Sequence, residues 1–135
     1  MNRRLVLRLS LLGPVMGALV VFGVFPEGTD RFAWMAVNIG CAVAIARSHV
    51  ENVFWHGVVT GFIVGASSTL VQGIFADTLI ANTPWMLVRF ADQPEGFNLQ
   101  FFIMMLVPFI GIAGALLTGF LSYLAGRVLR REGGS

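Results

Sequence analysis

Charged residues are excluded from long stretches of this chain. No formal charge lies between Val53 and Phe75, and none lies between Leu99 and Gly126. The 135 residues are 56% hydrophobic and 12% charged, with a mean hydropathy of +0.80, so polar side chains are too few to cover a soluble globule. Hydrocarbon excludes charge in this way, and the connecting loops collect it. The sequence therefore predicts an all-α integral membrane protein whose solvent is the lipid bilayer.

A helix needs ~20 residues to cross a hydrocarbon core of ~30 Å, and four apolar stretches approach or exceed this length. They cover residues 5–25, 31–47, 53–75 and 99–126, and the second is marginal in length. We predict a single membrane domain, residues 1–135, built as a bundle of four transmembrane helices. The first stretch has no small-x-small cleavage site before "PEGTD", so we interpret it as an uncleaved anchor.

The outer loop, residues 76–98, is the longest connection. Thr83 followed by Pro84 is typical of a helix N-terminus, so we predict a short interfacial helix in this loop. Two interpretations remain open. The loop is a cap that closes the outer end of the bundle, or it is a lid or a surface for a partner.

Arginine placement predicts which helix ends share a side of the membrane. Two of the nine arginines, Arg31 and Arg89, fall on one side. The other seven fall opposite, at Arg3, Arg4, Arg8, Arg47, Arg127, Arg130 and Arg131. By the positive-inside rule the N- and C-termini are both cytoplasmic. We expect an integral protein of a bacterial inner membrane.

Small residues recur at steps of four in every predicted span. In lipid, helices associate closely where small residues let their backbones approach. The residues predicted to pack helices are Gly13, Gly17, Gly40, Gly57, Gly61, Gly65, Gly111, Ala115 and Gly119. Ala36 and Ala44 extend the stripe around Gly40. Such faces pack helices within one chain, or they bind a second copy or another membrane protein.

Two prolines lie inside predicted spans. Pro14 and Pro108 each lack the N–H that would bond the carbonyl four residues earlier. We predict a bend at each position, as an ordinary structural kink.

The stretch "HVENVFWH", residues 49–56, concentrates polar groups between two apolar runs. One interpretation starts the third helix at Ser48 as a capping box with Glu51. The other places His49 and Glu51 in a turn and starts the helix after Asn52, and we prefer it because the second span needs length. The spacing of His49, Glu51 and His56 does not match a metal-binding motif, so we predict no metal ligand and no cofactor.

A few polar side chains lie at membrane depth. On the third span, His56, Thr60 and Ser67 share one helix face and predict a polar lining. Asn38 and Gln72 also lie at this depth. We prefer hydrogen bonds between helices as their role, and a place in the polar lining is the alternative.

The chain carries no nucleophile and base pair, no paired carboxylates and no phosphate-cradling loop, so we predict that it is not an enzyme. Its low charge argues against nucleic-acid binding. Two functions remain. The first is a non-catalytic subunit or scaffold that binds another membrane protein through small-residue helix faces. The second is a homo-oligomeric channel or carrier for a small neutral or weakly polar solute.

Overall fold

The computed structural model describes residues 1–132, apart from the side chains of Leu87, Arg131 and Glu132. The Arg131 charge, which belongs to the predicted basic C-terminal cluster, therefore lies outside the described part. Within residues 1–132 helices are the only regular secondary structure, which confirms the all-α prediction. They are α1 (Arg3–Ser10), α2 (Leu12–Val21), α3 (Asp30–Arg47), α4 (Val53–Ile74), α5 (Ala76–Asn82), α6 (Pro84–Phe90) and α7 (Leu99–Glu132).

Three helical segments in the described part of the chain are long and apolar enough to cross a membrane. They are Arg3–Val21, Val53–Ile74 and Leu99–Arg130. Helix α3 is less apolar because Asp30, Arg31 and Arg47 lie at its ends and Asn38 in its middle. Its 18 residues reach about 27 Å at 1.5 Å each, close to the thickness of a hydrocarbon core. A fourth crossing through α3 stays a prediction.

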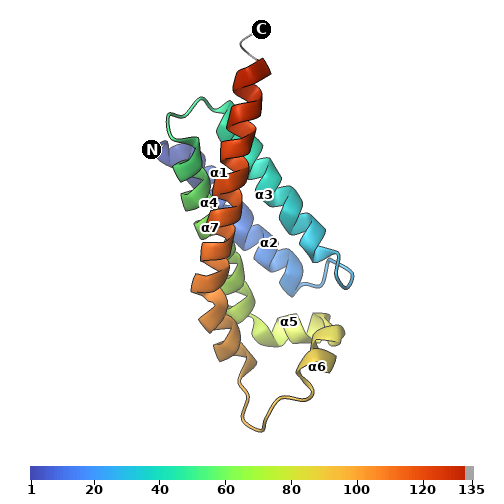
Figure 1. Ribbon diagram of the computed structural model, residues 1–135. Coiled ribbons are helices and arrows are strands. Elements are labelled where there is room, and N and C mark those ends of the chain that lie inside the picture. The colour runs from blue at the N-terminus through green and yellow to red at the C-terminus, as the bar shows by residue number, and fades with distance from the viewer. Residues whose placement is uncertain (133–135) are drawn as a thin grey trace.

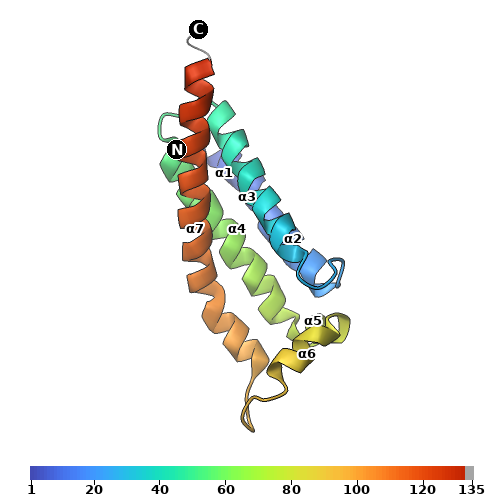
Figure 2. The same ribbon diagram turned by 45° about the vertical axis from the view of Figure 1, so that its right-hand side comes forward.

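Helix α4 lies at the centre of the arrangement. It packs most extensively against α7, and α1 and α2 cover another of its sides. Helix α3 lies mainly along α7. Figures 1 and 2 show these long helices side by side, with both chain termini at the same end of the molecule.

The two prolines have different effects. The first predicted span is interrupted at Leu11, between α1 and α2, one residue after the Ser10 carbonyl that Pro14 cannot bond. Leu11 keeps right-handed helical backbone angles, so α2 continues from α1 without a sharp turn. Pro108 lies inside α7, which stays one helix, and Figure 2 shows the first part of α7 inclined to the rest.

The first span ends earlier than predicted. Helix α2 stops at Val21 rather than residue 25, and Gly23 adopts a positive φ of 65°. Glycine accepts this conformation without the Cβ clash of other residues. The chain therefore turns before the apolar run has ended, since hydropathy alone does not locate a backbone reversal.

The outer loop contains two short helices, where one was predicted. Helix α6 begins at Pro84 as expected, and the additional helix α5 places Leu79 and Ala76 in a core with Val20 and Val21 of α2. Asn82 donates its side-chain amide to the Val21 carbonyl at 3.1 Å, which satisfies a carbonyl at the end of α2. These contacts are those of a cap that closes this end of the structure.

The polar stretch begins with a turn over residues 48–52, and its last four residues form the first turn of α4. Helix α3 ends at Arg47 and α4 begins at Val53, as the preferred alternative predicts. The Ser48 hydroxyl donates back to the Ile45 carbonyl at 2.7 Å, so it does not form a capping box with α4. His49 has a φ of 53°, in the left-handed region.

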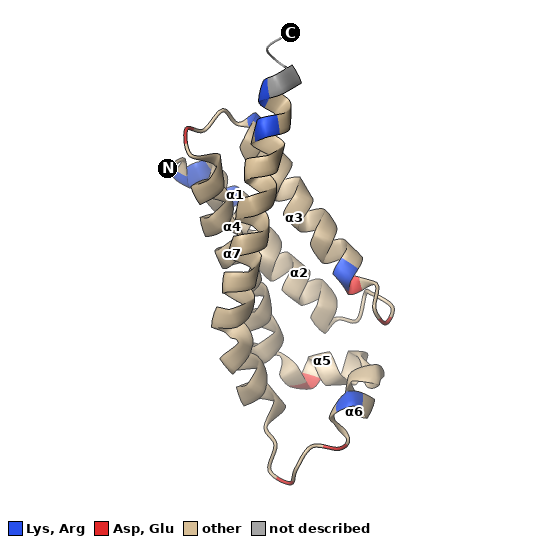
Figure 3. Cartoon of the chain, viewed as in Figure 1, with Lys and Arg blue, Asp and Glu red and all other residues tan. Residues whose placement is uncertain are grey.

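Charged residues lie at helix ends and in the connecting loops, and the long middle parts of the helices carry none. Figure 3 shows arginines around the chain termini and the end of α3, while Arg31 and Arg89 belong to the start of α3 and to α6 near the opposite end. The apolar middle separates the two groups.

Candidate functional site

The closest helix contact is between α4 and α7, and glycine makes it possible. A Cβ placed on Gly57 would lie 2.7 Å from the Thr118 carbonyl oxygen, and one on Gly65 would lie 2.7 Å from that of Ile110. A Cβ on Gly61 would lie 2.7 Å from the carbonyl carbon of Gly114 and closer still to its oxygen. Real side chains do not approach so closely, so the backbones of α4 and α7 meet at these three positions.

A second glycine contact joins α2 to α4. A Cβ on Gly13 would lie 2.6 Å from the Val64 carbonyl oxygen, and one on Gly17 would lie 2.7 Å from that of Ser68. Helix α4 thus uses one face for α7 and another for α2. Glycines of α4 itself make the first contact, whereas glycines of α2 make the second.

The remaining predicted packing residues divide into two groups. Gly111, Ala115 and Gly119 are buried on α7, where Gly111 faces Phe62 and Gly119 faces Val58. Gly40 on α3 is exposed, and nothing lies within 4 Å of a Cβ built there. Within the described chain, its stripe contacts no neighbouring helix at this position.

A buried hydrogen bond connects α3 with α7. The Thr118 hydroxyl donates to Asn38 Oδ1 at 2.6 Å, and Asn38 Nδ2 donates to the Trp34 carbonyl at 2.7 Å. Both side chains are buried. A bond between helices, the preferred interpretation, is therefore present at Asn38, whose amide is satisfied on both atoms.

Gln72 behaves differently. Its side-chain nitrogen lies 3.4 Å from Ser68 Oγ of the same helix, so this weak bond does not connect two helices. Gln72 also lines a small, mostly apolar cavity of about 250 Å³ with Thr69, Met86 and Phe102, beneath the α5–α6 cap.

Helices α1 and α2 cover the polar stripe of α4. His56 is buried, donates from Nδ1 to the Asn52 carbonyl at 2.8 Å and accepts the Asn2 amide at Nε2 at 2.8 Å. Thr60 is fully buried, and its hydroxyl has no partner among the described residues. Ser67 is half-buried beside Gly13. An open polar path along this face is not favoured within one chain.

The Asn2 contact could not be predicted from the sequence, because no local pattern links the N-terminus to residue 56. It also fixes the tautomer of His56, since Nδ1 must carry the proton to donate. Both ring nitrogens are thereby occupied. Among the described residues, no group of three or more His, Cys, Asp or Glu side chains is placed to hold a metal ion.

Within the described residues, the packed helix contacts contrast with the stripe of small residues at Gly40 on α3, which stays uncovered. Comparison with family models, curated proteins and solved structures finds no match for this chain.

Proposed function

We propose that this chain is a non-catalytic subunit or scaffold of a bacterial inner membrane that binds a helix of another membrane protein. In this proposal α1–α2, α3, α4 and α7 all cross the bilayer, with both termini cytoplasmic. The arginines clustered around the termini support that orientation through the positive-inside rule.

The outer face of α3 is the proposed binding surface. We define it by its exposed residues Phe32, Met35, Ala36, Ile39 and Gly40. At 100° per residue these five side chains fall on one side of the helix. The buried residues Asn38, Cys41 and Ile45 fall on the other side, towards the rest of the chain.

The open space at Gly40 carries this proposal. Glycine in a helix interior costs roughly 0.5–1 kcal/mol relative to alanine, and it offers lipid no side chain to contact. Small residues at steps of four in a membrane helix instead allow another backbone to approach. Gly13 and Gly17 of α2 and Gly57, Gly61 and Gly65 of α4 have such a backbone neighbour inside the chain, whereas the exposed stripe of Ala36 and Gly40 is left for an external helix.

The test compares Gly40→Leu with Ala113→Leu, each extracted gently from native membranes for measurement of native mass. Ala113 is exposed on α7, so the control adds the same bulk at another small, uncovered position. We expect a larger membrane protein to accompany the wild type and the control and to be lost from Gly40→Leu. A wild-type chain that carries no protein would refute the proposal. A dimer of this chain lost in Gly40→Leu would replace it with self-association.

A further inference from the structure

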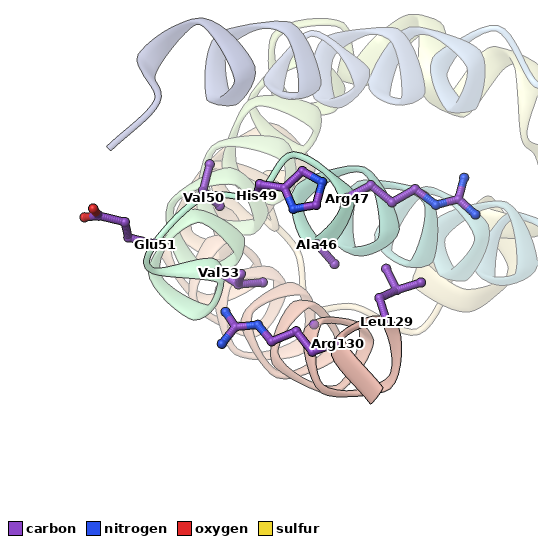
Figure 4. Close-up of a pocket in the computed structure, with 9 residues that line it drawn as sticks. Ala46, Arg47, His49, Val50, Glu51, Val53, Leu129 and Arg130 are labelled. Carbon is purple, nitrogen blue, oxygen red and sulfur yellow. The ribbon is translucent and has the colours of Figure 1, made fainter. Parts of the chain in front are cut away.

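A charged cleft lies beside the last turns of α3 and α7. The C-terminal turns of α3 and α7 and the turn before α4 enclose a space of about 780 Å³. Ala46, Val53 and Leu129 form apolar parts of its wall, and Arg47, His49 and Arg130 supply its polar groups (Figure 4). The cleft is large enough for a small-molecule headgroup.

The charge balance of the cleft is positive. Figure 4 shows the Arg130 guanidinium beside Val53, whereas the Arg47 side chain extends away from the cleft on the opposite side. Glu51 also borders the cleft, and its carboxylate points outward. Both arginines are exposed, so their long side chains are free to turn towards a ligand, and with Glu51 they leave a net positive charge at the cleft.

The first turn of α4 adds to this field. No side chain caps it at Asn52, and Val53, the first residue of the helix, lines the cleft. The free amides and the helix dipole make this helix end favourable for an anion. The uncapped turn and the two arginines thus both favour a negatively charged ligand.

The position of the cleft distinguishes a lipid from a soluble anion. Arg47 follows the apolar run of α3 directly, so the cleft lies where hydrophobic surface gives way to charge. In a bilayer this is the level of the lipid phosphates, provided that α3 and α7 cross as proposed above. Basic pockets between membrane helices at this level bind anionic headgroups, and guanidinium groups suit phosphate through paired N–H donors.

We propose that this cleft binds the phosphate group of an anionic phospholipid, with Arg47 and Arg130 as its cationic ligands. The left-handed backbone at His49 belongs to the turn that places the imidazole at the wall of the cleft. Strain of this kind in a non-glycine residue is common at ligand sites.

The experiment uses the full chain in nanodiscs that contain equal amounts of phosphatidylglycerol and phosphatidylcholine. Lipids retained after transfer to detergent are counted by native mass spectrometry. We expect the wild type to retain phosphatidylglycerol preferentially. The double variant Arg47→Gln, Arg130→Gln should lower that preference about 30-fold, from ~1 kcal/mol for each arginine near the surface. The matched control Arg31→Gln, Arg89→Gln removes two arginines that do not line the cleft and should leave the preference for phosphatidylglycerol unchanged.

A second variant should change phosphatidylglycerol retention in the opposite direction. Glu51→Gln removes the acidic group and should raise phosphatidylglycerol retention severalfold, a gain that misfolding does not produce. Equal losses in the double variant and its control would overturn the proposal, as would unchanged retention in the double variant. Displacement of the lipid by millimolar inorganic phosphate would also overturn it and assign the cleft to a soluble anion. The outcome is independent of the Gly40→Leu test of partner binding.

Discussion

Replacing Gly61 with alanine should push α4 and α7 apart. The new methyl group would lie 2.7 Å from the carbonyl carbon of Gly114 and 2.6 Å from Thr118 Oγ1. Ordinary carbon contacts lie at about 3.5–4.0 Å, so the helices must separate by about 1 Å at this point. The obstruction on the Gly114 side is backbone, which cannot rotate away as a flexible side chain can.

Gly40→Ala is the matched control for this change. It makes the same chemical substitution in a helix where a Cβ meets nothing within 4 Å. Alanine gains up to about 1 kcal/mol of helix propensity at both sites, so this contribution cancels in the comparison. What remains is the cost of overpacking at Gly61, about 1–3 kcal/mol.

The assay is reversible unfolding of the isolated chain by denaturing detergent, followed by circular dichroism and tryptophan fluorescence. We expect Gly61→Ala to be less stable than Gly40→Ala by about 1–3 kcal/mol, with Gly40→Ala at or above the wild type. A difference below about 0.5 kcal/mol, the usual effect of a neutral surface change, would refute the close backbone contact between α4 and α7.

Three further predictions concern hydrogen bonds. A double-mutant cycle of Asn38→Ala and Thr118→Val should give a coupling free energy of about 0.6 kcal/mol, and at most about 1.7, as for other hydrogen bonds between membrane helices. Additive effects in the same unfolding assay would contradict the bond. His56→Leu removes the acceptor of the amide at the start of α1, so amide exchange in α1 should accelerate, while His49→Leu leaves it unchanged. If exchange stays the same in both variants, α1 is held by other contacts. Pro14→Ala restores an N–H that can bond the carbonyl four residues earlier, so exchange at the junction of α1 and α2 should slow. Unchanged exchange there would mean that the missing donor does not cause the interruption.

Periodicity predicts which residues share a helix face but not what covers that face. Gly57, Gly61 and Gly65 lie together at the α7 contact, as steps of four require. Gly40 belongs to a stripe of the same spacing and yet faces outward, because burial of Asn38 and its bond to α7 turn the opposite side of α3 inward. The choice of partner depends on contacts between distant parts of the chain.

Periodicity likewise did not predict which helices cover the polar stripe of α4. His56, Thr60 and Ser67 share a face, as their spacing predicts, but α1 and α2 lie over it. Nothing in the local sequence of α4 indicates which apolar segment covers it. The start of α4 at Val53 was predictable, because the number of residues expected for the second span can be counted directly in the neighbouring sequence.

Helix α5 was not predicted from the sequence because it is short. Its seven residues are fewer than the window that reveals helical periodicity, and no proline or glycine separates it from the end of α4 at Ile74. Its position depends on Leu79 entering the core beside α2. A tertiary contact, rather than a local signal, separates α5 from α4.

The central position of α4 has a consequence for synthesis. Helices α2 and α3 contact each other little, and their main partners, α4 and α7, are made after them. The Asn38 amide in particular has no partner from another helix until Thr118 leaves the ribosome. In the topology proposed above, the N-terminal half would wait in the membrane without its helix partners, and Asn38 Oδ1 would be exposed to lipid at an energetic cost. A chain truncated before α7 would keep that oxygen without its partner, which would distinguish it from the finished protein.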